Sequence, residues 1–163
     1  MIEGKNEFPA VVDALFQWWQ GLGDHTSDPA ALRRCATTLD VVLTPAYQTL
    51  YGRLDARFDR LSSDADRLAA IVGLLSHIKK DDANSAPAKT FSQGEKPVLS
   101  PLRFRRVLEA QNVDELYPVL RRALPLVGYV INVRKLARDV YYWGDRTKKD
   151  WAYSYQWPDK INS

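Results

Sequence analysis

The sequence predicts an all-α protein: a single compact domain, residues 1–163, folded as an irregular helical bundle of about seven or eight helices. Apolar residues recur at spacings of three and four along most of the chain, and no stretch alternates convincingly between apolar and polar residues. Several helix starts are marked by a capping side chain followed by proline. The composition, 45% hydrophobic and 26% charged, is that of an ordinary globular protein with enough apolar residues for a core.

Four helices are predicted in the first half of the chain, over residues 8–20, 29–43, 45–58 and 64–78. Asp28 and Thr44 each precede a proline and are expected to cap the second and third helices. Asp64 or Asp66 is expected to cap the fourth. The predicted inward face of the second helix consists of Leu32, Cys35, Ala36, Leu39 and Val42 or Leu43.

Residues 79–97 break the helical pattern. The segment is rich in Ser, Ala, Pro, Asp and Lys, and Phe91 is its only large apolar residue. Because it lacks apolar periodicity, we predict a long, exposed and mobile loop, which is either functional or a tolerated insertion.

Four further helices are predicted over residues 101–108, 114–125, 133–143 and 145–155. Ser100, which precedes a proline, and Asn132 are expected to cap the first and third of these helices. Pro118 is expected in the first turn of the second helix, where it is tolerated, and Pro125 is expected to kink or end that helix. Gly144 is expected at the position that closes the third helix.

Charge is divided unequally along the chain. Residues 1–98 hold 11 Lys and Arg against 13 Asp and Glu, and residues 99–163 hold 12 against 7, so the two net charges are −2 and +5. A basic C-terminal half, 99–163, makes a polyanionic partner plausible. The basic residues expected on outer helix faces are Arg33, Arg34, Arg103, Arg105, Arg106, Arg121, Arg122, Arg134, Lys135, Arg138, Arg146, Lys148 and Lys149.

Arginine is the commoner cation in these positions, and its forked donors suit phosphate oxygens. The alternative is a solvated helix face with local pairs, such as Arg105 with Glu109 at i+4. Neighbouring aromatic residues diverge by about 100° on a helix, so they cannot all face one core. Partial exposure, for stacking on unpaired bases or for anchoring a protein partner, is expected for some of Trp18, Tyr142, Trp143, Tyr153 and Trp157.

No motif for catalysis is found. His25 and His77 lie outside any metal-ligand spacing, and the single cysteine, Cys35, excludes an internal disulfide. Asp64 and Asp66 could be imagined as metal ligands of a nuclease, but both suit a helix N-terminus. We therefore predict a non-catalytic protein with no cofactor, metal or small-molecule substrate. No apolar run approaches the ~18–20 residues that span a bilayer, which predicts a cytoplasmic protein without membrane contact.

Four motifs past residue 99 resemble, in order and spacing, the CasB family, the small subunit of the type I-E CRISPR effector complex Cascade. They are S-P-L-R-F-R-R-V-L at 100–108, L-R-R-A-L at 120–124, L-A-R-D-V-Y-Y-W-G at 136–144 and K-D-W-A-Y-S-Y at 149–155. Each motif is common in helical proteins, but the four together are fairly specific. Trp18-Trp19, residues 31–35 and Ala46-Tyr47 resemble the family's opening helices more loosely.

The resemblance implies an all-α, non-catalytic subunit of an RNA-guided surveillance complex in antiviral defence. Its implied partners are the large subunit, the backbone subunits, a second copy of itself, crRNA and target DNA. It also implies a basic surface that binds nucleic-acid backbone and stabilises the R-loop and the displaced DNA strand. Carried over motif by motif, the expected nucleic-acid-binding residues are Arg34, Arg103, Arg105, Arg106, Arg121, Arg122 and Arg146.

The chain departs from the family pattern in three places. Asp145 stands where some relatives have a basic residue, residues 79–97 differ in length and basic content, and Pro125 interrupts a helix expected to continue.

The alternative function is a helical protein–protein adaptor whose basic faces bind acidic protein partners.

Overall fold

The computed structural model of the chain describes residues 7–23, 29–59 and 61–158. Helices make up 69% of it, which confirms the all-α prediction. The α-helices are α1 (Phe8–Gln20), α2 (Pro29–Arg33), α3 (Thr38–Val42), α4 (Pro45–Arg57), α5 (Ala65–Leu75), α6 (Pro87–Phe91), α7 (Pro101–Leu108), α8 (Val113–Ala123), α9 (Val133–Tyr141) and α10 (Asp145–Ser154). Three short 3₁₀ helices, η2 (Gly21–Gly23), η3 (Leu61–Asp64) and η4 (Leu124–Val127), join them.

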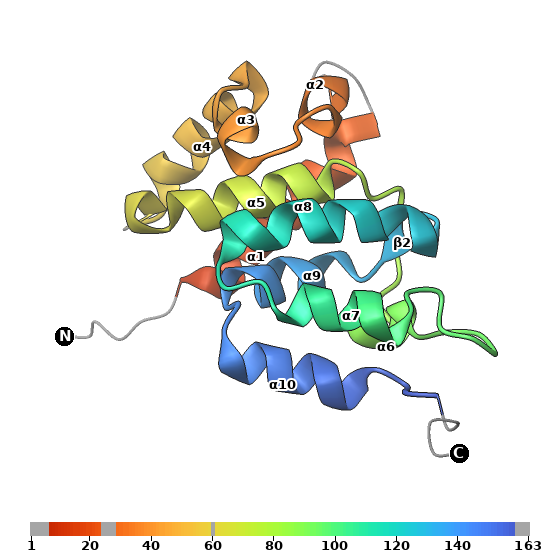
Figure 1. Cartoon of the computed structure of the whole chain (residues 1–163). Helices are drawn as coiled ribbons and strands as arrows, with labels where there is room; N and C mark the ends of the chain where they lie inside the picture. The colour runs from red at the N-terminus through yellow and green to blue at the C-terminus, as the bar shows by residue number, and fades with distance from the viewer. Residues whose placement is uncertain (1–6, 24–28, 60, 159–163) are drawn as a thin grey trace.

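The centre of the fold is α5, which packs against α3, α8 and α9 (Figure 1). Its residues from Leu68 to Leu75 are all buried, as expected for a helix that is apolar on every side. Gly73 allows the close approach, because a Cβ atom there would lie 2.7 Å from Cε1 of Tyr117 and 2.8 Å from Cγ2 of Val41. One cluster of buried side chains includes residues from α1 to α10.

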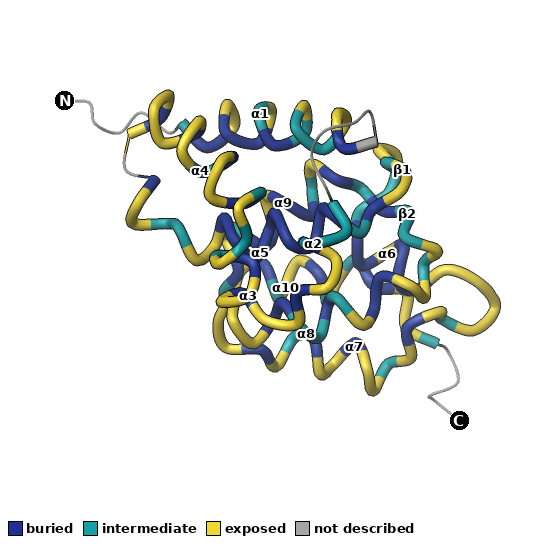
Figure 2. Tube along the Cα trace, turned by 90° about the horizontal axis from the view of Figure 1, so that it is seen from above, coloured by how far each residue is buried: buried dark blue, intermediate teal, exposed yellow. Residues whose placement is uncertain are grey.

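The outer helices turn one face to the core and one to solvent. In Figure 2, exposed and buried residues alternate along α1, α4 and α7, whereas α5 and α9 are mostly buried. In α9, the apolar spacing predicts an inward face at Val133, Leu136, Ala137, Val140 and Tyr141; the first four are buried and Tyr141 is half-buried. None of the helices in the described ranges is long and apolar enough to cross a membrane.

Most predicted helix caps are present. The side chains of Thr44, Ser100 and Asn132 accept a hydrogen bond from the backbone N–H three residues later. Gly144 was wrongly predicted to close α9: its backbone is extended (φ 172°), and it is the residue before α10. Pro118 was wrongly expected in the first turn of α8: the helix begins at Val113, with Asn112 as its cap, and Pro118 lies inside it.

The single helix predicted over 29–43 is wrong, because the chain forms two short helices, α2 and α3. Thr37 and Asp40 form a capping box in which each side chain accepts a hydrogen bond from the other's backbone N–H, and this starts α3 anew. Because of this break, α3 packs a different face against the core than a continuous helix would. Leu39, predicted to point inward, is 63% exposed, whereas Cys35 is buried as predicted. Of the alternatives Val42 and Leu43, Val42 is the one that packs partly buried against the core, and Leu43 is 70% exposed. Asp28, the expected cap of α2, lies outside the described residues.

The prediction of an exposed loop over 79–97 is also wrong for most of the segment. Lys80–Asp81 forms strand β1, which pairs in parallel with β2 (Val130–Ile131). Residues Pro87–Phe91 form α6, where Phe91 is fully buried beside Trp151. Only the stretch from Gln93 to Val98 forms a loop that projects from the surface, next to α6 and α7 in Figure 1. α6 and the split of the second helix bring the described α-helices to ten, against the seven or eight predicted.

Candidate nucleic-acid interface

Two neighbouring helices, α7 and α8, carry most of the predicted arginines. In α7, Phe104 and Val107 are buried, so Arg103, Arg105 and Arg106 lie on the exposed side. In α8, Leu120 and Ala123 are buried, which leaves Arg121 and Arg122 toward the surface. Because α7 packs beside α8, the helical periodicity of each brings arginines of both to one seam.

A groove with a volume of about 680 Å³ lies along this seam; we call it the arginine groove. Four of the seven predicted residues line it: Arg103 and Arg106 from α7, and Arg121 and Arg122 from α8. Its other lining residues are His77, Leu99, Val107, Val119, Ala123, Pro125, Leu126 and Tyr129. The groove therefore combines four guanidinium groups with a mostly apolar wall.

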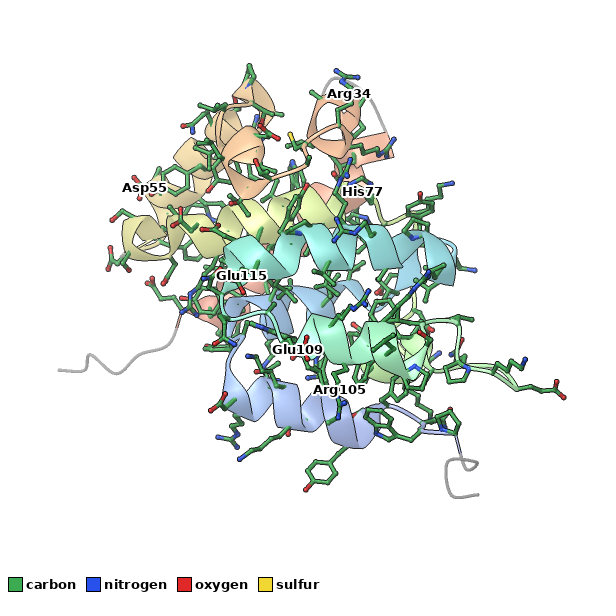
Figure 3. The ribbon with its side chains drawn as sticks, viewed as in Figure 1. Arg34, Asp55, His77, Arg105, Glu109 and Glu115 are labelled. Atoms are coloured by element: carbon green, nitrogen blue, oxygen red, sulfur yellow. The ribbon has the colours of Figure 1, made fainter. Side chains whose placement is uncertain are left out.

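Among the residues that the structure describes, no carboxylate lines the arginine groove. Within the described part of the chain, the ion pairs are Arg134 with Asp13 and Lys135 with Asp139, and neither pair lies in the groove. The predicted alternative of a local pair between Arg105 and Glu109 is not formed among these residues (Figure 3). The exposed guanidinium groups of Arg103, Arg106 and Arg122 are thus available to an external anion.

Arg121 differs from the other three groove arginines because its side chain makes a hydrogen bond to the backbone of another helix. Its Nη2 donates a hydrogen bond to the carbonyl oxygen of Arg33 at 3.0 Å, and Nε of Arg33 donates to the carbonyl oxygen of Ser76 at 2.7 Å. These two bonds connect α8, α2 and the end of α5. Nε of Arg121 is buried and has no hydrogen-bond partner among the described residues. A substitution of Arg121 would change the fold as well as the charge.

His77 and Tyr129 lie together in the wall of the groove, with nearly parallel rings whose centroids are 6.4 Å apart. Burial is the main reason that the pKa of His77 is lowered, to about 4, and the cationic Arg121 and Arg33 lower it further. The imidazole is therefore neutral at physiological pH. The backbone of Tyr129 is left-handed, with φ 61°, a conformation that costs a residue with a Cβ atom about 1 kcal/mol.

Acidification should destabilise the fold through His77. The unfolded chain binds a proton at His77 near pH 6.5, whereas the folded chain does so only near pH 4. Below about pH 6.5 the unfolded state therefore gains protons first, and this histidine alone should lower the free energy of unfolding by about 2 kcal/mol at about pH 5. Urea unfolding of the wild type and of His77→Gln at about pH 7 and pH 5 measures this effect. An equal loss of stability in both proteins would contradict it.

The other three predicted residues lie outside the groove. Figure 3 shows Arg34 beside α2 at one end of the molecule and Arg105 near α10 toward the other end, with His77 between them. Arg146 is exposed on α10. The structure therefore brings four of the seven residues into the groove, and Arg34, Arg105 and Arg146 do not line it, although Arg105 lies on the same helix as Arg103 and Arg106.

The aromatic residues divide into a buried and an exposed group. Trp143, one of the five residues of which some were expected to be partly exposed, is buried, and its Nε1 donates a hydrogen bond to the carbonyl oxygen of Ala110 at 3.0 Å. Tyr142, Tyr153 and Trp157 are exposed as expected, Tyr153 at 89%. None of these three lines the arginine groove.

Fold and groove together define a class of protein: a small helical protein with a cationic groove between two helices. The chain belongs to the CRISPR-associated protein Cse2 family, whose model matches residues 28–155, and this confirms the resemblance to CasB. In fold it is similar to a chain of the crystal structure of E. coli Cascade bound to a PAM-containing double-stranded DNA target. The TM-score is 0.64 at 19% identity over 87% of this chain and 91% of that chain. No curated protein matches the chain.

Proposed function

We propose that this small subunit of a CRISPR Cascade complex binds the phosphate backbone of the displaced DNA strand in its arginine groove and thereby stabilises the R-loop. The other Cascade subunits, a second copy of the chain, crRNA and target DNA are the partners that this role requires. We further propose that the role is one of binding and not of catalysis. The observation that carries the proposal is the groove itself, whose wall holds four arginines and no carboxylate of the described residues.

Arginine is suited to this task because its planar guanidinium offers paired donors to phosphate oxygens and remains charged at any physiological pH. Contacts of this kind are blind to base sequence, as a subunit that must accept every target requires. They also make binding depend on salt, since each neutralised phosphate releases a counterion.

A small free-energy contribution from the protein is enough to stabilise an R-loop. The RNA–DNA heteroduplex is about as stable as the DNA duplex that it replaces, so protein contacts to the backbone can decide the balance. Three exposed arginines in one groove can supply such contacts without reading any base.

A matched pair of triple variants tests the proposal on the isolated chain. The groove variant carries Arg103→Ala, Arg106→Ala and Arg122→Ala, and the control carries Arg34→Ala, Arg105→Ala and Arg146→Ala. Both lose the same charge from exposed positions, and both keep Arg121. Fluorescence anisotropy of a labelled single-stranded DNA, titrated at several salt concentrations, should give a salt slope that is smaller by about 2 for the groove variant, since each lost phosphate contact contributes about 0.7.

The control variant should keep most of the wild-type slope and affinity. Equal losses in the two variants would show that the whole basic surface attracts DNA and that the groove has no special part in it. Unchanged binding in both variants would favour the protein–protein adaptor.

A further inference from the structure

Tyr129 stands at a position whose backbone favours a different residue. It follows Gly128, and both residues have a left-handed backbone, with φ 61° and 65°. Glycine or asparagine adopts this conformation at lower cost than tyrosine. Backbone hydrogen bonds stabilise the turn itself. The N–H of Tyr129 donates to the carbonyl oxygen of Leu124, and the carbonyl oxygen of Tyr129 accepts from the N–H of Lys79 at 2.8 Å. The backbone therefore needs the conformation but not the tyrosine side chain.

The ring of Tyr129 lies in the wall of the arginine groove, half-buried. The neutral imidazole of His77 is nearly parallel to it, at an angle of 16°. The ammonium group of Lys79, an exposed residue, lies 4.9 Å from the ring centroid. A strained aromatic residue thus shares the groove wall with four arginines and has the ammonium group of Lys79 over its ring.

We propose that Tyr129 is a stacking platform for one unpaired base of single-stranded DNA, an inference that rests on the function proposed above. Every base has a π-face, so stacking on tyrosine adds affinity without sequence preference. The groove arginines hold phosphates next to the stacked base. The base displaces the ammonium group of Lys79 from the ring, and this exposed side chain then binds a neighbouring phosphate. A base paired inside a duplex cannot reach the ring, so Tyr129 makes the groove select single strands over duplex DNA.

The experiment separates the base from the backbone. Binding of the full-length chain is measured by anisotropy to a labelled thymidine oligonucleotide of about twelve nucleotides and to an abasic oligonucleotide of the same length. Tyr129→Leu keeps a side chain of moderate size but loses the aromatic face, and Tyr129→Phe keeps the face. We expect Tyr129→Leu to bind the thymidine oligonucleotide about tenfold more weakly and the abasic one with wild-type affinity. Tyr129→Phe should bind both like the wild type.

A wild-type measurement guards against a variant that fails to fold. An oligonucleotide with 2-aminopurine near its centre should lose fluorescence when the wild-type chain saturates it, because stacking quenches this base. Unchanged 2-aminopurine fluorescence, or an equal loss of affinity for thymidine and abasic oligonucleotides in Tyr129→Leu, would overturn the inference. If the groove triple variant still weakens binding to the abasic oligonucleotide, the proposed function stands. If that variant binds both oligonucleotides like the wild type, the proposed function itself fails.

Discussion

Phe91→Ala should lower the free energy of unfolding by about 3–5 kcal/mol, the usual cost of removing a fully buried aromatic ring. The ring of Phe91 has no exposed surface, and its centroid lies 6.2 Å from that of Trp151 in α10. Its carbonyl oxygen also accepts a hydrogen bond from the N–H of Leu99 at 2.9 Å, which closes the loop that precedes α7. The substitution would therefore leave a cavity at the point where α6 meets α10.

Val98→Ala is the matched control, because Val98 lies next to the end of the segment 79–97 and is 42% exposed. It should change the free energy of unfolding by no more than about 0.5 kcal/mol, as surface substitutions usually do. Urea unfolding followed by circular dichroism measures both variants. A cost below about 1 kcal/mol for Phe91→Ala would mean that the segment is the loose loop that its composition indicates.

The second large effect concerns the assembled complex. With the groove triple variant as the small subunit, we expect R-loops to be destabilised on the order of tenfold to a hundredfold, because three phosphate contacts are lost from a nearly balanced exchange. The effect should grow weaker as salt is raised, since salt already reduces these contacts in the wild type. The triple variant that changes Arg34, Arg105 and Arg146 removes the same charge and should have a much smaller effect.

Much of the fold could be predicted from local patterns. The bounds of α1 follow from its apolar spacing and its terminal glycines, and the starts of α7 and α9 follow from the side chains of Ser100 and Asn132. These features depend on residues within one or two turns of each other, so the sequence contains the whole cause.

Two errors in the predicted fold have identifiable physical reasons. Phe91 is a single apolar residue among polar ones, and one residue defines no period; only α10, far away in the sequence, shows that it is buried. The break before α3 did have a local signal, Thr37 followed three residues later by Asp40. The continuous apolar pattern across 29–43 outweighed it, although a capping box can restart a helix within such a pattern.

The candidate site could be predicted only in part, because a groove is made by tertiary packing. Charge and motifs selected all four groove arginines but gave equal weight to Arg34, Arg105 and Arg146, which do not line the groove. Nothing in the spacing of Arg121 indicates that it holds the backbone of Arg33. Tyr129 was missed, and its one signal was the preceding Gly128, which marks a turn but does not show that the ring lines a groove.

The central claim is that the arginine groove holds the displaced strand, and the lifetime of the R-loop tests it most directly. Cascade is assembled with the wild-type chain, the groove triple variant or the control triple variant, and R-loop closure is followed on single supercoiled DNA molecules. We predict that the groove variant shortens the lifetime at least about tenfold and that the control stays within about twofold of the wild type. Equal lifetimes for the groove variant and the wild type would contradict the claim.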